Sequence, residues 1–186
     1  MTKSVVVSGP PAIGKTTVAK GLAVEFNLQY LSGGDILKEL ANEQGFSSSG
    51  DDWGDTDEGM QFLDQRKNNP KFDKIVDDKL KTLFENGRVV ITSYTLPWLV
   101  NDGIKIWLSG TLENSVKRMQ SRDNVSEISA LDIVKKRFAE NKLIYKNLYN
   151  FEFGEDLSVF DTIIETDNLD AGQVLNKAKS IVRELI

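Results

Sequence analysis

The chain has 186 residues and a formal net charge of −5, a length typical of one domain and a balance without the basic excess that bulk nucleic-acid binding needs. It contains neither cysteine nor histidine, which excludes disulfides, thiolate metal sites and histidine-based acid–base catalysis. No apolar run is long enough to span a bilayer and no signal peptide is evident, so we expect a cytoplasmic protein without a membrane partner.

The first predicted element is a strand over the β-branched residues 5–7. It leads directly into the spacing G-x-x-x-x-G-K-[ST] of a phosphate-binding loop, or P-loop, which begins at Gly9 and ends at Thr16. Gly9 and Gly14 permit the tight turn that brings backbone N–H groups close to phosphate oxygens. Lys15 supplies a positive charge for the β- and γ-phosphates, and the hydroxyl of Thr16 can bind Mg²⁺.

A helix is predicted directly after this loop because apolar residues recur at helical spacing from Val18 to Phe26. The N-terminus of that helix directs a partial positive charge at a bound anion. The alternative is a Gly/Pro turn before an unrelated helix, but the preceding strand and the following helix are the context that the motif requires. We therefore expect Mg²⁺ and a nucleoside triphosphate here, held by Gly9, Pro10, Pro11, Ala12, Ile13, Gly14, Lys15, Thr16 and Thr17.

The second predicted strand, 28–31, ends in a Ser-Gly-Gly-Asp segment before a short amphipathic helix. Asp35 closes this segment, on the sheet edge that faces the ligand crevice in open α/β folds. Two interpretations remain open, and both can hold at once. Asp35 contacts the substrate or hydrated Mg²⁺, or it caps the helix N-terminus.

The stretch Gly45–Gly59 differs from its surroundings because it is rich in glycine, serine and acidic residues. Long polar segments inside a domain are usually lids or disordered, and this one lacks the spacing of a calcium-binding loop. We expect a solvated flap in which Trp53 packs over another group. Helical character resumes at Met60, and a further helix is predicted from Pro70 to the Asn-Gly pair at 86–87.

The remaining elements complete an α/β pattern. Three more strands are predicted at 89–92, which is buried, at 104–108 and at 162–165. Further helices are predicted over 113–122, over a longer segment that carries residues 133–148, and over 174–185. The unalternating apolar strands predict a five-stranded parallel sheet with helices on both faces, the three-layer arrangement of P-loop proteins.

Three arginines are candidates for a lid. Arg118 and Arg122 lie one helical turn apart, and Arg137 lies on the following helix. Phosphoryl transfer needs positioning and positive charge, which a closing lid with arginines supplies while it excludes water. The alternative is an ordinary solvated helix face. The base-reading signature N-K-x-D of GTPases and the acidic strand end of motor ATPases are absent, which favours a small kinase.

These features give the chain a family resemblance. It resembles the nucleoside monophosphate kinases, most closely the archaeal cytidylate kinases, over nearly its whole length. The resemblance rests on 8–17, 32–36, 69–73, the arginine-bearing helices, Tyr145, Tyr149 and 156–161. It implies one domain over 1–186, with an acceptor-binding segment at about 33–87 and a lid at about 117–140. It also implies transfer of the ATP γ-phosphate to CMP or dCMP, and it places Arg118, Arg122 and Arg137 where the family has lid arginines. With Lys15 from the P-loop and Asp35 from the sheet edge, these are the predicted catalytic residues.

Two departures from the family concern the acceptor. Many members carry an arginine after the third strand that grips the acceptor phosphate, and here Tyr94 occupies that place. The acidic stretch 48–59 resembles an insertion on the acceptor side. We expect the acceptor, a small molecule, to contact Asp35, Trp53, Ser93 and Tyr94.

Three functions remain open for the sequence alone. The acceptor is a nucleoside monophosphate, or it is another small anion such as a mevalonate-type phosphate. If the acceptor group is an alcohol, Asp35 is the candidate base. The third alternative is a nucleotide-binding module without catalysis, against which the intact Lys15–Thr16 pair argues. We expect a monomer or a homodimer.

Overall fold

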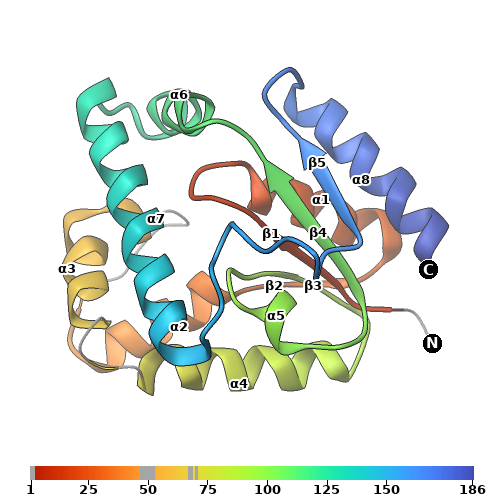
Figure 1. Cartoon of the computed structure of the whole chain (residues 1–186), viewed down its shortest axis with the longest axis horizontal. Coiled ribbons are helices and arrows are strands. Elements are labelled where there is room, and N and C mark those ends of the chain that lie inside the picture. The colour runs from red at the N-terminus through yellow and green to blue at the C-terminus, as the bar shows by residue number, and fades with distance from the viewer. Residues whose placement is uncertain (1–2, 47–52, 67–68, 70) are drawn as a thin grey trace.

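The computed structural model describes residues 3–46, 53–66, 69 and 71–186. Its centre is one sheet of five parallel strands in the order β2-β3-β1-β4-β5 (Figure 1). The strands are β1 (Val5–Ser8), β2 (Gln29–Ser32), β3 (Val89–Thr92), β4 (Ile104–Ser109) and β5 (Thr162–Glu165). The predicted five-stranded parallel sheet is therefore confirmed.

Strand β1 occupies the middle of the sheet. Val6 pairs with Ile91 of β3 on one side and with Lys105 of β4 on the other. Strands β2 and β3 lie to one side of β1, while β4 and β5 lie to the other. The chain thus leaves β1 at the point where the strand order divides, which is where open α/β sheets bind ligands.

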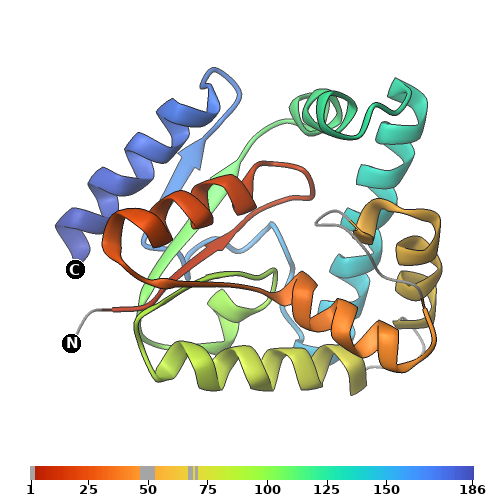
Figure 2. The same cartoon turned by 180° about the vertical axis from the view of Figure 1, so that it is seen from behind.

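Helices cover both faces of the sheet. They are α1 (Lys15–Phe26), α2 (Gly33–Glu43), α3 (Asp57–Arg66), α4 (Lys71–Glu85), α5 (Leu96–Leu99), α6 (Leu112–Asp123), α7 (Glu127–Tyr149) and α8 (Ala171–Leu185), with a 3₁₀ turn η1 (Trp53–Asp55) before α3. On one face α1 and α8 pack against Val5 and Val7 (Figure 2). On the other face α4 and the turn α5 pack against Val6 and Ile91. Alternate residues of β1 therefore supply two separate cores.

Helix α3 starts earlier than the sequence predicts, so the expected flap over 45–59 is too long. Thr56 provides the reason, because its Oγ1 accepts a hydrogen bond from the backbone N–H of Gly59 at 3.2 Å. Asp57 and Glu58 follow in the first turn, where negative charge favours a helix N-terminus. Residues 47–52 of the expected flap, and the helix start expected at Pro70, lie outside the described residues.

Within the part of the chain that the structure describes, no helix combines the length and the apolar character needed to cross a membrane.

Leu22→Ala should lower the free energy of unfolding by about 2–5 kcal/mol, because the Leu22 side chain is fully buried between the sheet and α8. Val24→Ala is the matched control on the same helix, since Val24 is 85% exposed, and it should change stability by less than about 0.5 kcal/mol. Urea unfolding followed by circular dichroism measures both values. Equal losses would contradict the assignment of this core.

Candidate active site

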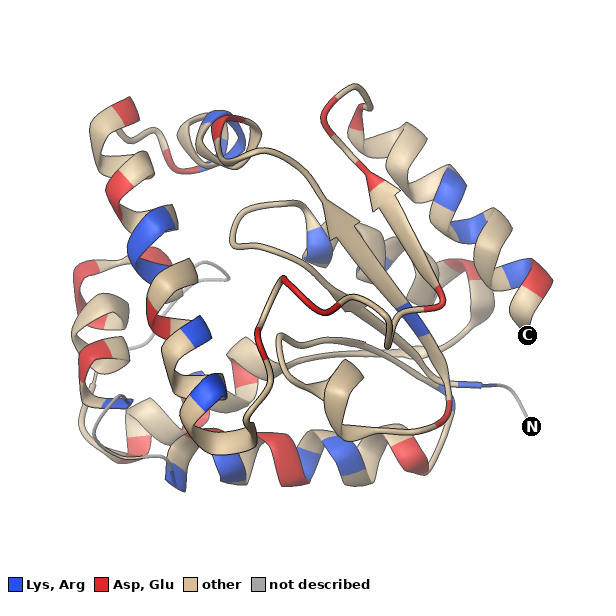
Figure 3. Ribbon diagram, in the orientation of Figure 1, with Lys and Arg blue, Asp and Glu red and all other residues tan. Residues whose placement is uncertain are grey.

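A cavity of about 860 Å³ opens beside the P-loop. Its walls come from the P-loop and α1, from α2 to α4, from the segment after β3, and from α6 and α7. Helix α6 follows β4, and both α6 and α7 carry Lys and Arg positions (Figure 3). Of the residues singled out by sequence, the cavity brings together Ala12, Ile13, Gly14, Lys15, Thr16, Thr17, Trp53, Ser93, Tyr94, Arg118, Arg122 and Arg137.

The P-loop has the backbone shape that a phosphate group requires. Gly9 and Gly14 have φ values of 148° and 101°, which side chains disfavour. A Cβ on Gly9 would lie 2.4 Å from the carbonyl oxygen of Leu108, so this glycine lets the loop pass directly over β4. No side chain caps α1, which leaves its first N–H groups available to an anion.

Lys15 is half-buried and folded back over the loop. Its Nζ donates to the carbonyl oxygens of Gly9 at 3.0 Å and Pro10 at 2.5 Å, and it lies 4.6 Å from the centre of the Tyr94 ring. Burial, followed by repulsion from Arg137, holds the pKa of Lys15 well below its usual value. A bound anion would offset both effects, so the geometry favours a phosphate at this position.

The hydroxyl-bearing residues Thr16 and Thr17 are exposed at the start of α1. Within the described residues, no group of three or more His, Cys, Asp or Glu side chains is placed to hold a metal ion. A magnesium ion beside Thr16 would therefore take most of its oxygen ligands from phosphates and water, as Mg²⁺ commonly does.

Arg118 supports the P-loop from α6. Its guanidinium donates to the carbonyl oxygen of Ile13 and, at 3.2 Å, to that of Thr166. These bonds connect α6 to the loop and to the residue that follows β5. Arg118 therefore reaches the phosphate-binding region through the loop backbone.

Arg122 and Arg137 converge on one carboxylate, that of Asp55 in η1. Arg122 Nη2 lies 2.5 Å from Asp55 Oδ2, and Arg137 Nη1 bonds to Asp55 Oδ1. Arg137 Nη2 also donates to the hydroxyl of Tyr94 at 3.3 Å. Burial raises the pKa of Tyr94, so its phenol is neutral and can accept this bond. Helices α6 and α7 do fold back on each other, as the convergence of these two arginines requires.

Sequence reasoning missed Asp55 as an individual residue, because it assigned the whole acidic stretch to a solvated flap. The Asp55 side chain is only 7% exposed. Trp53 is the reason, since it is buried against Phe62 at a ring separation of 5.7 Å and fixes the turn. Packing of Trp53 over another group is thus confirmed.

A second missed group, an ion pair, lines the part of the cavity between α3, α4 and α7, which we call the far wall. Arg66 at the end of α3 is buried, and its Nε donates to Asp73 Oδ2 of α4 at 3.2 Å while its Nη2 bonds to Oδ1. The same Nη2 lies 3.4 Å from Asn141 Oδ1 of α7. This pair therefore joins three helices at the cavity wall.

Asp77 stands one helical turn after Asp73 and also lines the cavity. Its carboxylate accepts hydrogen bonds from the hydroxyls of Thr95 and, at 2.7 Å, Tyr149. Burial raises the pKa of Asp77 to about 6 although these two bonds oppose the shift. The available sequence signal was an acid pair on the apolar face of α4, beside Val76 and Leu80.

Asp35 does not reach the cavity, and its expected capping role is wrong. Ser32 caps α2, because its Oγ accepts from the N–H of Gly34 at 3.1 Å, and the helix begins two residues before Asp35. The Asp35 side chain is 54% exposed and pairs with Lys38 at 2.9 Å. Contact of Asp35 with substrate or Mg²⁺ stays a prediction without support from this geometry.

Ser93 lines the cavity but already has a structural task. Its Oγ accepts from the N–H groups of Thr95 at 3.2 Å and Leu96 at 3.1 Å, which holds the start of α5. Its contact with an acceptor remains a prediction.

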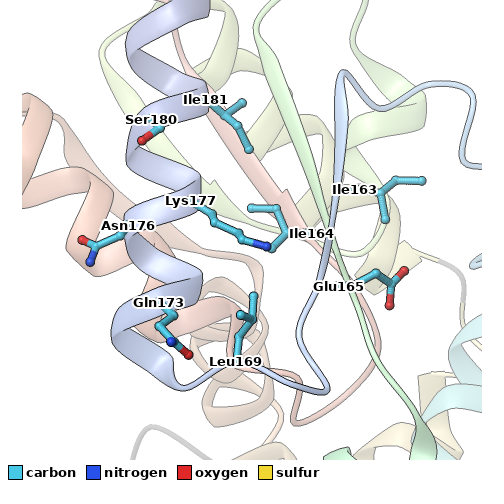
Figure 4. Close-up of a pocket in the computed structure, with 9 residues that line it drawn as sticks. All are labelled: Ile163, Ile164, Glu165, Leu169, Gln173, Asn176, Lys177, Ser180 and Ile181. Atoms are coloured by element: carbon cyan, nitrogen blue, oxygen red, sulfur yellow. The ribbon is translucent and has the colours of Figure 1, made fainter.

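A second hollow lies between β5 and α8 (Figure 4). Glu165 and Lys177 are the two charged groups of its lining, which is otherwise apolar or neutral. Its lining shares only Leu169 with the larger cavity and contains no P-loop residue. The larger cavity is therefore the candidate active site.

Comparison with known proteins identifies the family. The sequence profile of the cytidylate kinase-like family matches residues 5–168. A cytidylate kinase of Methanocaldococcus jannaschii is 31% identical over 97% of this chain and 98% of its own length. A cytidylate kinase of Staphylothermus marinus is also 31% identical, over 98% of this chain and 95% of its own length. A shikimate kinase structure from Bacteroides thetaiotaomicron shares the fold, with a TM-score of 0.60 and 14% identity over 98% of each chain. The chain belongs to the cytidylate kinase-like family of phosphotransferases.

Proposed function

We propose that this protein is a nucleoside monophosphate kinase that transfers the γ-phosphate of ATP to CMP or dCMP. The observation that supports this most is the single cavity that joins the P-loop to Arg122, Arg137 and a polar far wall. The likeness to cytidylate kinases over nearly the whole chain supports the acceptor class. In this proposal residues of about 33–87 bind the acceptor and those of about 117–140 form the lid.

The donor half of the reaction belongs to the P-loop. Its backbone N–H groups and Lys15 would hold the β- and γ-phosphates, and Thr16 would contribute an oxygen ligand to Mg²⁺. Magnesium would neutralise part of the phosphate charge. Lys15 would exchange its present bonds to the loop carbonyls for phosphate oxygens, which stabilise its protonated form.

The transfer step requires positive charge more than it requires a base. An oxygen of the acceptor phosphate is already an anion, and it forms a bond to the γ-phosphorus as the bond to the β-phosphate oxygen breaks. Arg122 and Arg137 would stabilise the charge on the transferring group. Trp53 and Tyr94 line the same space and would help exclude water.

The far wall offers hydrogen-bonding groups for the rest of the acceptor. The Arg66–Asp73 pair presents donors and acceptors together, and Asp77 adds a carboxyl held by two hydroxyls. A nucleoside with amino and hydroxyl groups suits this wall better than an apolar acceptor would.

A second candidate is a kinase for an acceptor with a hydroxyl group, such as a mevalonate-type phosphate. Two features favour it: the family resemblance puts Tyr94 at the position of an acceptor-gripping arginine, and the Asp55 carboxylate acts electrostatically on Lys15. Transfer to a hydroxyl calls for a base. For this candidate the base would be Asp55 rather than the predicted Asp35, because Asp55 lines the cavity and Asp35 does not.

An ADP-release assay with ATP, run over nucleoside monophosphates and small phosphorylated alcohols, tests the acceptor. We expect CMP or dCMP to give the highest kcat/KM, because both supply an anionic phosphate and a polar base to the far wall. Turnover confined to the alcohols would support the second candidate. Absence of turnover with every monophosphate would refute the proposed acceptor class.

Lys15→Ala should lower kcat/KM by about 10²–10³ or more, the loss typical for one preorganised charge on the reacting group. Lys20→Ala is the matched control, since Lys20 lies exposed on the same helix and outside the cavity lining. Steady-state kinetics and thermal melting of both variants separate a catalytic loss from unfolding. Normal turnover by the folded Lys15 variant would sink the donor-site assignment.

Asp77→Asn should change how stability depends on pH. The pKa of Asp77 is about 6 in the folded chain, against about 3.9 in unfolded peptides, so the folded state binds more protons between these values. The stabilisation from this protonation is complete below pH about 3.9 and is lost as pH rises through about 6.

The free energy of unfolding of the parent chain, relative to Asp77→Asn, should therefore fall by up to about 3 kcal/mol between pH about 4 and 7, since two pKa units correspond to that energy. Urea unfolding at a series of pH values measures it. Parallel profiles for the two proteins would show that burial does not raise this pKa.

A further inference from the structure

Asp55 occupies the place where the arginines of this cavity would bind a phosphate. It comes from η1, whereas Arg122 and Arg137 come from α6 and α7. A carboxylate and a phosphate both present negatively charged oxygens that accept hydrogen bonds from a guanidinium, so each arginine can bind either group. The Asp55 carboxylate therefore occupies an anion-binding site that Arg122 and Arg137 form.

The charges around Asp55 favour a more negative group than one carboxylate. Arg122, Arg137 and Lys15 influence one another electrostatically at this point, and Asp55 is the acid that partly offsets their effect on Lys15. Two carboxylates face these three cations, because Asp123 also pairs with Arg122 at 2.6 Å, and the pKa of Lys15 stays well below its usual value. A phosphate carries more charge and would stabilise all three more fully.

The turn that carries Asp55 is firmly built. Trp53 packs on Phe62, and Thr56 Oγ1 donates to the carbonyl oxygen of Trp53 at 2.7 Å. Gly59 lets α3 approach η1 closely, because a Cβ there would lie 2.2 Å from the Trp53 carbonyl oxygen. The carboxylate is thus presented to the arginines by a defined structure that includes α3.

We propose that Asp55 is an internal phosphate mimic, which holds Arg122 and Arg137 together in the unliganded enzyme and is displaced by a substrate phosphate. The inference rests on the proposed function in that the displacing ligand is a phosphate of the donor or acceptor. Two anions side by side repel each other, so the phosphate and the Asp55 carboxylate compete for the arginine pair. This competition lowers the affinity of the unliganded enzyme for the substrate phosphate. It thereby gives the acidic stretch around Asp55 a role in substrate binding.

Asp55→Asn tests the competition, because asparagine has nearly the same shape without the charge. Isothermal titration calorimetry measures the dissociation constants of inorganic pyrophosphate and of ATP with Mg²⁺. We expect both to fall about tenfold, as when the binding-competent fraction rises from about a tenth to most of the molecules. Circular dichroism confirms that the variant is folded, and Asp55→Ser serves as a second uncharged variant.

Asp64→Asn is the matched control. Asp64 lies on α3, pairs with Lys136 of α7 at 3.1 Å, and its removal changes the net charge by the same amount. Its dissociation constants should stay within about twofold of the parent values. A tenfold gain in this control as well would assign the effect to overall charge and overturn the proposal.

Two further results would overturn it. Unchanged binding in both Asp55 variants would show that the carboxylate does not compete with phosphate. Weaker binding would show that Asp55 only positions the arginines. Pyrophosphate binding requires no acceptor, so tighter binding together with inactivity toward CMP would refute the proposed substrate and leave the role of Asp55 standing. Turnover of CMP together with unchanged pyrophosphate binding in the Asp55 variants would support the proposed substrate and refute the role of Asp55.

Discussion

The close passage of the P-loop over β4 is the constraint on which the other parts of the site depend. A side chain at Gly9 would collide with the Leu108 carbonyl oxygen, at 2.4 Å, so only glycine lets the loop follow this path. The path directs the uncapped N-terminus of α1 toward the cavity. It also places the carbonyl oxygen of Ile13 where Arg118 can bond to it, which joins α6 to the loop. The backbone of the P-loop therefore positions both the start of α1 and, through Arg118, helix α6.

The electrostatics of the cavity explain why this arrangement suits phosphate. Burial and the neighbouring arginines disfavour the charged form of Lys15, and Asp55 relieves only part of this cost. The free energy stored in the unliganded site is released when a multiply charged anion enters. Arg122 and Arg137 link α6 and α7 to this anion site, because both arginines pair with Asp55.

The sequence predicted well what depends on short-range pattern. Strands β1 and β3 open on uninterrupted apolar runs, and the P-loop has a fixed spacing that tolerates few alternatives. It failed where the answer depends on which side chain faces inward. Asp35 and Asp55 both lie in polar segments after β2, and only the burial of Trp53 turns Asp55 toward the arginines. The cap of α2 was misassigned because Ser32 and Asp35 are both favoured cap residues, and the extended backbone at Ser32 decides between them.

The charged groups of the far wall, Arg66, Asp73 and Asp77, are better explained as part of the site than as part of the core. A buried ion pair such as Arg66–Asp73 must recover the cost of removing two charges from water, and apolar residues of similar size are often as stable or more so. Asp77 adds a further cost, since burial raises its pKa even with two hydroxyl donors. Stability alone gives little reason to keep three charged side chains between α3, α4 and α7. All three line the cavity, where a polar ligand can use the hydrogen-bonding capacity that they retain, and this explains their presence better than packing does.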